Sequence, residues 1–175
     1  MGVVISDASP LICLSGLRQL DLLRLLYGSV LVPETVWQEV TRPPTFTAPT
    51  TPAAVSDAKA AGWLKVAVAT NRPLVTQLET TLDPGEAEAI ALAVENKRSL
   101  LLIDERDGRQ VARALGVEIT GTLGVLLRAK TTRQIAAIQP LIKQLIQDLN
   151  FRLHPSLVER ILTEAGEKPD GQDTM

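Results

Sequence analysis

Residues 100–104 read LLLID, a run of four aliphatic residues that ends in an aspartate. An apolar run without polar alternation is typical of a strand that is buried on both faces of a parallel sheet. Residues 3–5 (VVI) form a similar run, and Asp7 falls at its end. A helical pattern follows each run. The first is expected to begin with Ser9 as its N-cap and Pro10 at its first position, and the second covers residues 106–115. Two units of this kind predict an α/β protein with a parallel sheet.

The same alternation of strand and helix continues between and beyond these two units. The leucines of residues 20–26 extend the first helical pattern to Gly28, a natural helix stop. Further strands are expected at residues 30–32, 63–68 and 117–119, and further helices at residues 33–40, 84–96 and 122–128. The helix at 84–96 begins with a capping aspartate, a first-turn proline and Glu86, which completes a capping box. The pattern predicts a three-layer α/β/α sandwich with a central parallel sheet.

Three segments fall outside this alternation. Residues 42–52 (RPPTFTAPTTP) contain four prolines, which predict a long loop that acts as a flap or faces a partner, with Phe46 as its aromatic contact. Beyond Gln134 the pattern is helical, with a break near residues 150–155. We therefore expect a main domain, a helical extension packed on it and a disordered tail, at residues 1–130, 131–167 and 168–175, respectively.

Composition limits the class of protein. The chain has 175 residues, the length of one domain, and 45% of them are hydrophobic, as in an ordinary globular protein. The formal net charge of −2 excludes binding of nucleic acid by a basic field over the whole surface, so any such contact must be local. Cys13 has no second cysteine to pair with and is expected to be a small buried residue. With no membrane-spanning run and no export signal, a cytoplasmic protein without a membrane partner is expected.

Acidic residues gather where this fold would place a site. In an open α/β sheet, ligands bind beyond the carboxyl ends of the strands, where Asp7 and Asp104 are expected. A carboxylate at such a position is costly to bury unless it is paired or bound to a metal. The predicted helices add further acids near this edge: Glu39, Glu86, Glu88 and Asp107.

Each acid also has a plainer explanation. Asp7 fits an Asx turn or a helix cap, and Glu86 fits the capping box alone. Glu39 fits a solvated helix surface, and Asp107 fits a favourable charge in a first helical turn. Asp104 is the hardest to explain in this way, because it follows four aliphatic residues. The indication of a site comes from the set of acids together.

Several motifs, taken in order, resemble the PIN (PilT N-terminus) superfamily, and most closely a branch related to the VapC-like toxins. The motifs are VVISDASPLICL (3–14), VPETVWQEV (32–40), LDPGEAEAIALA (82–93), LLIDERDGRQVARALG (101–116), ITGTLGVLL (119–127) and the ending FRLHPSLVERILTEAGE (151–167). The resemblance implies a parallel α/β/α sandwich whose acids bind a divalent metal and cut single-stranded RNA. It also implies a toxin of a toxin-antitoxin pair, a homodimer that binds a small antitoxin protein.

The resemblance also implies roles for individual residues. Asp7 matches the aspartate of the first strand, and Asp104 matches the aspartate that closes the fourth. Glu39 is similar to the glutamate of the helix after the second strand. Glu86 stands where most PIN domains have aspartate, with Glu88 as a rival for that position. The remaining matches are an additional acid, Asp107, and two small polar residues near the site, Ser9 and Thr122.

The chemistry of the donors favours Mg²⁺ or Mn²⁺. Carboxylate oxygens completed by water suit these hard cations, whereas zinc prefers His and Cys, of which the chain has one each. We expect Asp7 and Asp104 to bind the metal directly. Glu86 and Glu39 are expected to act through water or to orient the attacking hydroxide. An aspartyl phosphotransferase with Asp7 as nucleophile is a further reading, but Ser9 occupies the place of the second aspartate that such enzymes need.

Substrate contacts and partner surfaces are less sharply indicated. Arg106, Arg109 and Arg113 share one helical face and would form a basic rim, together with residues 97–98, although a solvated surface explains them equally well. Apolar positions in the last two helices predict core packing or a partner groove, at Leu141, Leu145, Leu149, Leu157 and Ile161. Because glutamate replaces aspartate in the third acidic position, a catalytically weak module that binds RNA or protein is the alternative to a nuclease.

Overall fold

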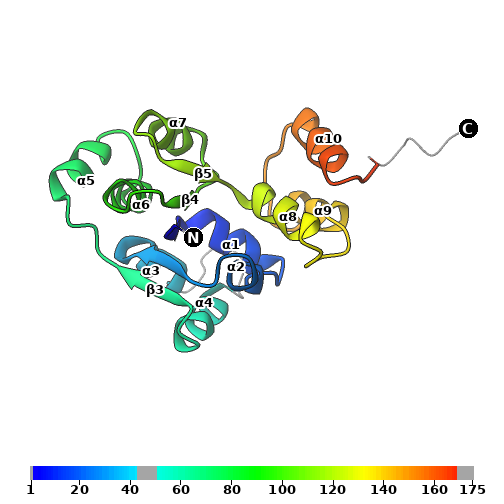
Figure 1. Ribbon diagram of the computed structural model, residues 1–175, viewed down its shortest axis with the longest axis horizontal. Helices are drawn as coiled ribbons and strands as arrows, with labels where there is room; N and C mark the ends of the chain where they lie inside the picture. Colours follow the sequence, from blue (N-terminus) through cyan, green and yellow to red (C-terminus); the bar gives the residue numbers. More distant parts are fainter. Residues whose placement is uncertain (1, 43–50, 169–175) are drawn as a thin grey trace, which may run out of the picture.

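The computed structural model describes residues 2–42 and 51–168. Within them a single sheet of five parallel strands runs through the molecule (Figure 1). The strands are β1 (Val4–Ser6), β2 (Val30–Pro33), β3 (Leu64–Ala67), β4 (Leu100–Leu102) and β5 (Glu118–Thr120). Their spatial order is β3-β2-β1-β4-β5, with every neighbouring pair parallel. The predicted parallel sheet is confirmed.

Ten helices flank this sheet in the described part of the chain. They are α1 (Ala8–Gly16), α2 (Asp21–Tyr27), α3 (Glu34–Thr41), α4 (Thr51–Ala60), α5 (Arg72–Leu78), α6 (Pro84–Glu95), α7 (Arg106–Ala114), α8 (Thr122–Thr131), α9 (Gln139–Gln147) and α10 (Pro155–Glu164). In Figure 1, α5, α6 and α7 occupy the upper left, whereas α8, α9 and α10 lie on the right, toward the C-terminal end.

Successive strand residues face opposite layers, which is what makes the fold a sandwich. Val4 of β1 and Leu102 of β4 belong to the apolar cluster formed with α1, α2 and α8. Ile5 and Leu101, which alternate with them, belong to a second cluster formed with α5, α6 and α7. Both faces of the sheet are therefore covered, and the chain has the predicted three-layer α/β/α architecture.

The order of the strands reverses between β1 and β4. The chain passes from β1 to β2 and β3 on one side and then returns to β4 on the other side. Ser6 pairs with Leu102, and the Asp7 N–H donates a hydrogen bond to the Leu102 carbonyl at 2.9 Å. The carboxyl ends of β1 and β4 thus lie side by side, at the position where ligands bind in open α/β sheets.

The first helical region differs from the sequence-based expectation. Helix α1 begins at Ala8 with Asp7 as its N-cap residue, so the predicted cap at Ser9 is wrong. The expected continuous helix to Gly28 is two helices, because the chain turns between Leu17 and Leu20, where Arg18 has a φ of 56°. The apolar periodicity hides this break, since both helices bury their leucines in the same cluster.

Two other segments were not anticipated. Helix α5 has no apolar run to mark it and depends on its cap, in which Asn71 Oδ1 accepts the Leu74 N–H at 3.2 Å. Helix α4 begins at Thr51, so the last two residues of the expected loop 42–52 are helical. The rest of that loop, with Phe46, and the expected tail after residue 168 lie outside the described residues.

The C-terminal helices join the main core. Ile142 and Leu145 of α9 and Ile161 of α10 are buried in the same cluster as α1 and α8. The break between the two helices ends at His154, which caps α10 by accepting the Ser156 N–H. Leu141, Leu149 and Leu157 are partly buried against this cluster. In the described part of the chain, no helix combines the length and apolar character required to cross a membrane.

Candidate active site

Asp7 is the centre of the acidic edge. It directly follows β1, is the N-cap residue of α1 and has only 3% of its surface exposed. Burial is the main cause that raises the pKa of Asp7 to about 7, and the Ala8 N–H opposes it. Three other carboxylates raise this pKa further, those of Glu86, Glu39 and Asp104. Three acids, from α3, α6 and the end of β4, therefore lie within electrostatic reach of Asp7.

Glu39 approaches Asp7 across the first turn of α6. A Cβ atom placed on Gly85 would lie 3.4 Å from Glu39 Oε2 and 3.6 Å from Asp7 Oδ1. Both oxygens thus border the same small volume, and the glycine lets the start of α6 approach them. Desolvation raises the pKa of Glu39, the nearby Asp83 raises it too, and Arg42 lowers it.

Glu86, and not Glu88, faces the other acids. Glu86 Oε2 accepts the Asp83 N–H at 3.3 Å, which confirms the predicted capping box. Glu86 Oε1 is buried, without a hydrogen-bond partner among the described residues. It faces α7, because a Cβ atom on Gly108 would lie 2.6 Å from it. Burial raises the pKa of Glu86, although the Asp83 N–H lowers it.

Glu88 points to a different set of partners. Its Oε2 accepts hydrogen bonds from the backbone N–H of Thr35, at 3.0 Å, and from the Thr35 hydroxyl. Its Oε1 lies 3.8 Å from Arg72 Nη1, which gives a salt bridge. Glu88 therefore links α6 to the start of α3 and to α5, and its oxygens are committed to these contacts.

Asp104 is held by the start of α8. Its Oδ1 accepts the Thr122 N–H at 2.7 Å, and its Oδ2 accepts the Thr122 hydroxyl at 2.6 Å. Burial raises the pKa of Asp104, while the two Thr122 hydrogen bonds and then Arg109 lower it. The neighbouring Gly121 leaves room for this carboxylate, since a Cβ atom there would lie 2.5 Å from Oδ1.

The three arginines of the expected basic rim occupy different environments. Arg109 is half-buried, and its Nη1 donates a hydrogen bond to the Ile103 carbonyl at 2.8 Å. Arg106 is exposed and lines a hollow beside the acids, whereas Arg113 is exposed one to two turns farther along α7. Residues 97–98 precede β4 and so lie at the opposite, amino-terminal edge of the sheet.

A hollow of about 420 Å³ opens between the first turns of α6 and α7. It is lined by Thr81, Leu82, Asp83, Glu86, Glu105, Arg106 and Asp107. Asp107 is exposed, and its charge raises the pKa of Glu86, so the structure brings it to the same region. Ser9 is half-buried in the first turn of α1, two residues after Asp7.

Two acids near the site were missed by sequence reasoning. Asp83 raises the pKa of both Glu39 and Glu86, yet its position before Pro84 suggested a helix cap alone. Glu105 raises the pKa of Glu86 and of Asp104, and its place directly after Asp104 was the available indication. The edge of the sheet is therefore more acidic than the sequence motifs suggested.

The donor set suits a hard divalent cation with water in its coordination sphere. Among the described residues, no three acids, histidines or cysteines are placed to hold a metal ion together. Mg²⁺ is commonly held by one or two carboxylates, with water and substrate phosphate as the other ligands. Glu86 Oε1, which has no hydrogen-bond partner among the described residues, is an oxygen of the type such an ion requires. The carboxylate oxygens of Asp7, which is buried near other negative charges, are of the same type.

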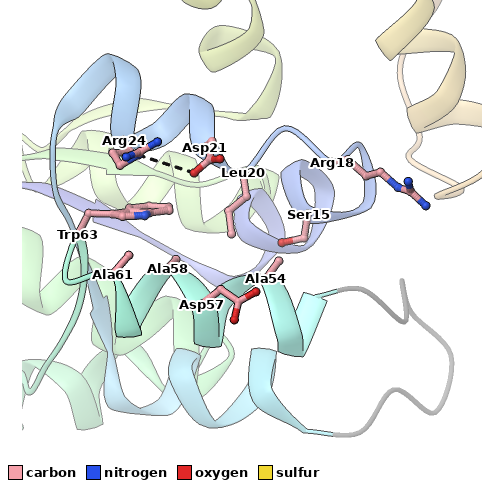
Figure 2. Close-up of a pocket in the computed structure, with 10 residues that line it drawn as sticks. All are labelled: Ser15, Arg18, Leu20, Asp21, Arg24, Ala54, Asp57, Ala58, Ala61 and Trp63. Atoms are coloured by element: carbon pink, nitrogen blue, oxygen red, sulfur yellow. Dashed lines mark ion pairs between the residues drawn. The ribbon is translucent and has the colours of Figure 1, made fainter.

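A separate hollow of about 540 Å³ lies between α1, α2 and α4, away from the acids (Figure 2). Alanines of α4 form one wall, and the Arg24–Asp21 pair, with 3.7 Å between Nε and Oδ1, stands on the other. None of the acids discussed above lines it.

The fold and the acidic edge define a class of protein: a doubly wound α/β protein with buried carboxylates at the point where strand order reverses. A family model described as a PIN domain matches residues 3–167. The match covers most of the chain, so the protein belongs to the PIN-domain family. PIN domains are generally metal-dependent nucleases, which assigns the chain a nuclease-type hydrolase function at this coarse level. No curated protein matches the chain.

Proposed function

We propose that the protein is an endoribonuclease that hydrolyses phosphodiester bonds of single-stranded RNA with Mg²⁺ or Mn²⁺. The observation that carries the proposal is the convergence on buried Asp7 of three carboxylates from separate elements. The unpartnered oxygen of Glu86 supports it, because a buried carboxylate oxygen without a donor needs a cation or a proton.

Each acidic residue has its own role in the proposed reaction. Asp7 and Glu86 Oε1 would hold the cation, and Asp104, whose two oxygens accept hydrogen bonds from Thr122, would bind it through water. Glu39 accepts a proton from the attacking water, because its oxygen borders the same volume as Asp7 Oδ1. Asp107 would bind the cation through water at the outer side of Glu86. The bound cation would supply an activated water and neutralise charge on the phosphate oxygens.

Helix capping alone does not explain these acids. A carboxylate that only caps a helix gains hydrogen bonds, and its pKa falls. The pKa values of Asp7, Glu86 and Asp104 are instead raised, since burial, the largest cause in each case, and the charges of nearby acids outweigh the hydrogen bonds that they accept. The acids are held together at an electrostatic cost, which a bound cation would remove.

We further propose that the chain is the toxin of a toxin-antitoxin pair, in the VapC-like branch. The support is the sequence likeness of its five motifs and of its ending. On this proposal the protein acts in the cytoplasm as a homodimer restrained by a small antitoxin protein. Light scattering of the purified chain tests the dimer, and co-expression with the product of a short neighbouring reading frame tests the antitoxin.

A matched pair of variants tests the nuclease. Glu86→Gln removes the charge at the acidic edge, and Glu88→Gln makes the same change two residues later, on the side of Thr35 and Arg72. With labelled single-stranded RNA and Mn²⁺, we expect Glu86→Gln to cleave at least about a hundredfold more slowly than the wild type. Glu88→Gln should keep its rate when tested below its unfolding temperature. Equal rates in all three proteins would contradict the proposed site.

A binding module with little catalysis is the second candidate. It is favoured by the absence, among the described residues, of three acids placed to hold a metal together, and by glutamate at the third position. Such a module would bind single-stranded RNA with equal affinity in EDTA and in Mn²⁺, and would leave the RNA intact.

A further inference from the structure

Two hollows flank the first turn of α6, and Asp83 lines both of them. One is the hollow toward α7 described above. The other, of about 530 Å³, lies toward α3 and is lined by Thr35, Gln38, Glu39, Arg42, Asp83, Pro84 and Gly85. In Figure 1, α6 lies between α3 and α7, as the packing of α6 on both helices requires. Acids line both hollows: Glu39 and Asp83 line the one toward α3, and Asp83, Glu86, Glu105 and Asp107 line the one toward α7.

Each hollow carries one arginine. Arg42 follows α3 and lines the hollow that contains Glu39. Its guanidinium is near enough to lower the pKa of Glu39. Arg106 begins α7 and lines the hollow that contains Glu86. Both side chains are exposed, so each is free to move toward a ligand in its hollow.

The charges around the hollows restrict how a polyanion would lie. The acids that line both hollows repel phosphates, so a phosphate is tolerated near them only beside a cation or a guanidinium. A bound cation would hold one phosphate at the first turn of α6, and each hollow offers a guanidinium, which binds phosphate with directed, charge-assisted hydrogen bonds. A strand lying across α6 would satisfy both conditions, whereas a strand ending at the acids would use one hollow only.

We propose that single-stranded RNA crosses the first turn of α6, with Arg42 binding a phosphate on one side of the scissile bond and Arg106 binding one on the other. This inference rests on the proposed function and adds Arg42 to its site. It explains why cleavage would occur within a strand, since both flanks hold substrate.

Binding measurements test the inference without cleavage. Fluorescence anisotropy in Ca²⁺ would give the affinity of a labelled RNA oligonucleotide for the wild type, Arg42→Gln and Arg106→Gln. Arg160→Gln is the matched control, because this exposed arginine of α10 lines neither hollow. We expect each of the first two variants to bind about five to ten times more weakly and the control to bind within twofold.

Neutral methylphosphonate linkages identify the phosphate that each arginine binds. A methylphosphonate at the phosphate that Arg42 binds should weaken binding by the wild type but cause no further loss of affinity in Arg42→Gln. A methylphosphonate on the other side of the scissile bond should weaken binding by the wild type but cause no further loss in Arg106→Gln. Additive losses at every position, or an Arg42→Gln affinity equal to the control, would overturn the inference. If the wild type cleaves RNA and Arg42→Gln binds RNA as tightly as the wild type, this inference is overturned and the nuclease proposal stands. Metal-independent RNA binding without cleavage would remove the nuclease proposal instead.

Discussion

Asp7, Glu86 and Asp104 each serve a helix as well as the acidic edge. Asp7 is the N-cap residue of α1, Glu86 closes the capping box of α6, and Asp104 accepts the first N–H of α8. The hydrogen bonds of Glu86 and Asp104 fix the direction of these two carboxylates before any ligand binds. The same contacts predict how amide substitutions will behave, because an amide retains an acceptor oxygen and loses the charge.

Asp104→Asn should separate folding from cleavage. The amide oxygen can still accept the Thr122 N–H, and the amide NH₂ can donate to the Thr122 hydroxyl, which now accepts. We expect the free energy of unfolding to stay within about 1 kcal/mol of the wild type. Cleavage of single-stranded RNA in Mn²⁺ should fall by at least about a hundredfold. An unchanged cleavage rate would exclude Asp104 from the mechanism.

The raised pKa of Asp7 predicts that the metal-free protein becomes less stable as the pH rises. The ordinary value is 3.8 and the folded value is about 7, so between them the folded state holds a proton that the unfolded state has released. The stability from this group is fully present below about pH 4 and is lost as the pH rises through about 7. The change is on the order of a few kcal/mol at most.

Urea unfolding in EDTA between pH 4 and pH 8 measures this effect. The two pKa values of Asp7, in the unfolded and the folded state, set this pH range. The wild type should lose stability over this range, whereas Asp7→Asn should give a flatter profile. Some slope remains in the variant, because the pKa values of Glu86 and Asp104 are raised as well. Parallel profiles of stability against pH in the two proteins would show that folding does not raise the pKa of Asp7. Mn²⁺ added at pH 8 should restore stability to the wild type more than to the variant.

At the scale of elements, α7 is tied to the end of β4 by Arg109. Its guanidinium donates to the Ile103 carbonyl and offsets the charge of Asp104. The expected basic rim thus contains one arginine that supports the site from within and one, Arg106, that lines a hollow. Sequence spacing could not separate them, because both share the helical face that the i, i+3 pattern describes.

Arg109→Met should destabilise the protein, because it leaves the Ile103 carbonyl without its donor and the Asp104 carboxylate without its nearby cation. We expect a loss of about 1 to 3 kcal/mol in the free energy of unfolding. Arg113→Met on the same helix is the control, and its effect should stay within about 0.5 kcal/mol, as for other exposed positions. Thermal and urea unfolding of both variants provide the comparison. If the two variants lose equal stability, Arg109 has no special structural role.

The elements that sequence reasoning recovered are those with a strong local pattern. The buried run before Asp104 and the capping box at Glu86 each predicted their element correctly. Helix α5 was missed because its cap at Asn71 is its main local feature. The split of the first helix was missed because apolar spacing continues through the turn at Arg18, whose left-handed backbone carries no sequence mark there.

At the scale of the whole molecule, the site depends on strand order, which local patterns do not contain. The residues Asp7, Glu39, Glu86 and Asp104 were predicted as a set, but their meeting requires β1 and β4 to be neighbours. Arg42 follows Glu39 by three residues at the end of α3, so local spacing places the two side by side, and packing of α3 on α6 brings both to the first turn of α6. Long-range packing therefore decides which of these residues share the site.

One carboxylate adds polar contacts to the apolar packing that holds the C-terminal helices on the main core. Glu167 Oε1 accepts the Ile138 N–H at 2.7 Å, and its Oε2 accepts the Gln139 N–H at 3.0 Å, at the start of α9. Lys130 of α8 adds a salt bridge, with 3.3 Å between Nζ and Oε1. These contacts lower the pKa of Glu167, although its partial burial acts in the opposite direction. One side chain thus joins the end of α10 to the helices α8 and α9.

Glu167→Ala should loosen these contacts and leave the sheet intact. Two backbone N–H groups at the start of α9 lose their acceptor, which predicts a loss of about 1 to 2 kcal/mol, as for removal of a helix cap. Hydrogen exchange should become faster in α9 and α10 and remain unchanged in β1 and β4. Glu164→Ala, an exposed acid on α10, should leave exchange as in the wild type. Faster exchange throughout the chain would mean that the C-terminal helices and the sheet unfold as one unit, and unchanged exchange in α9 would mean that Glu167 does not hold it.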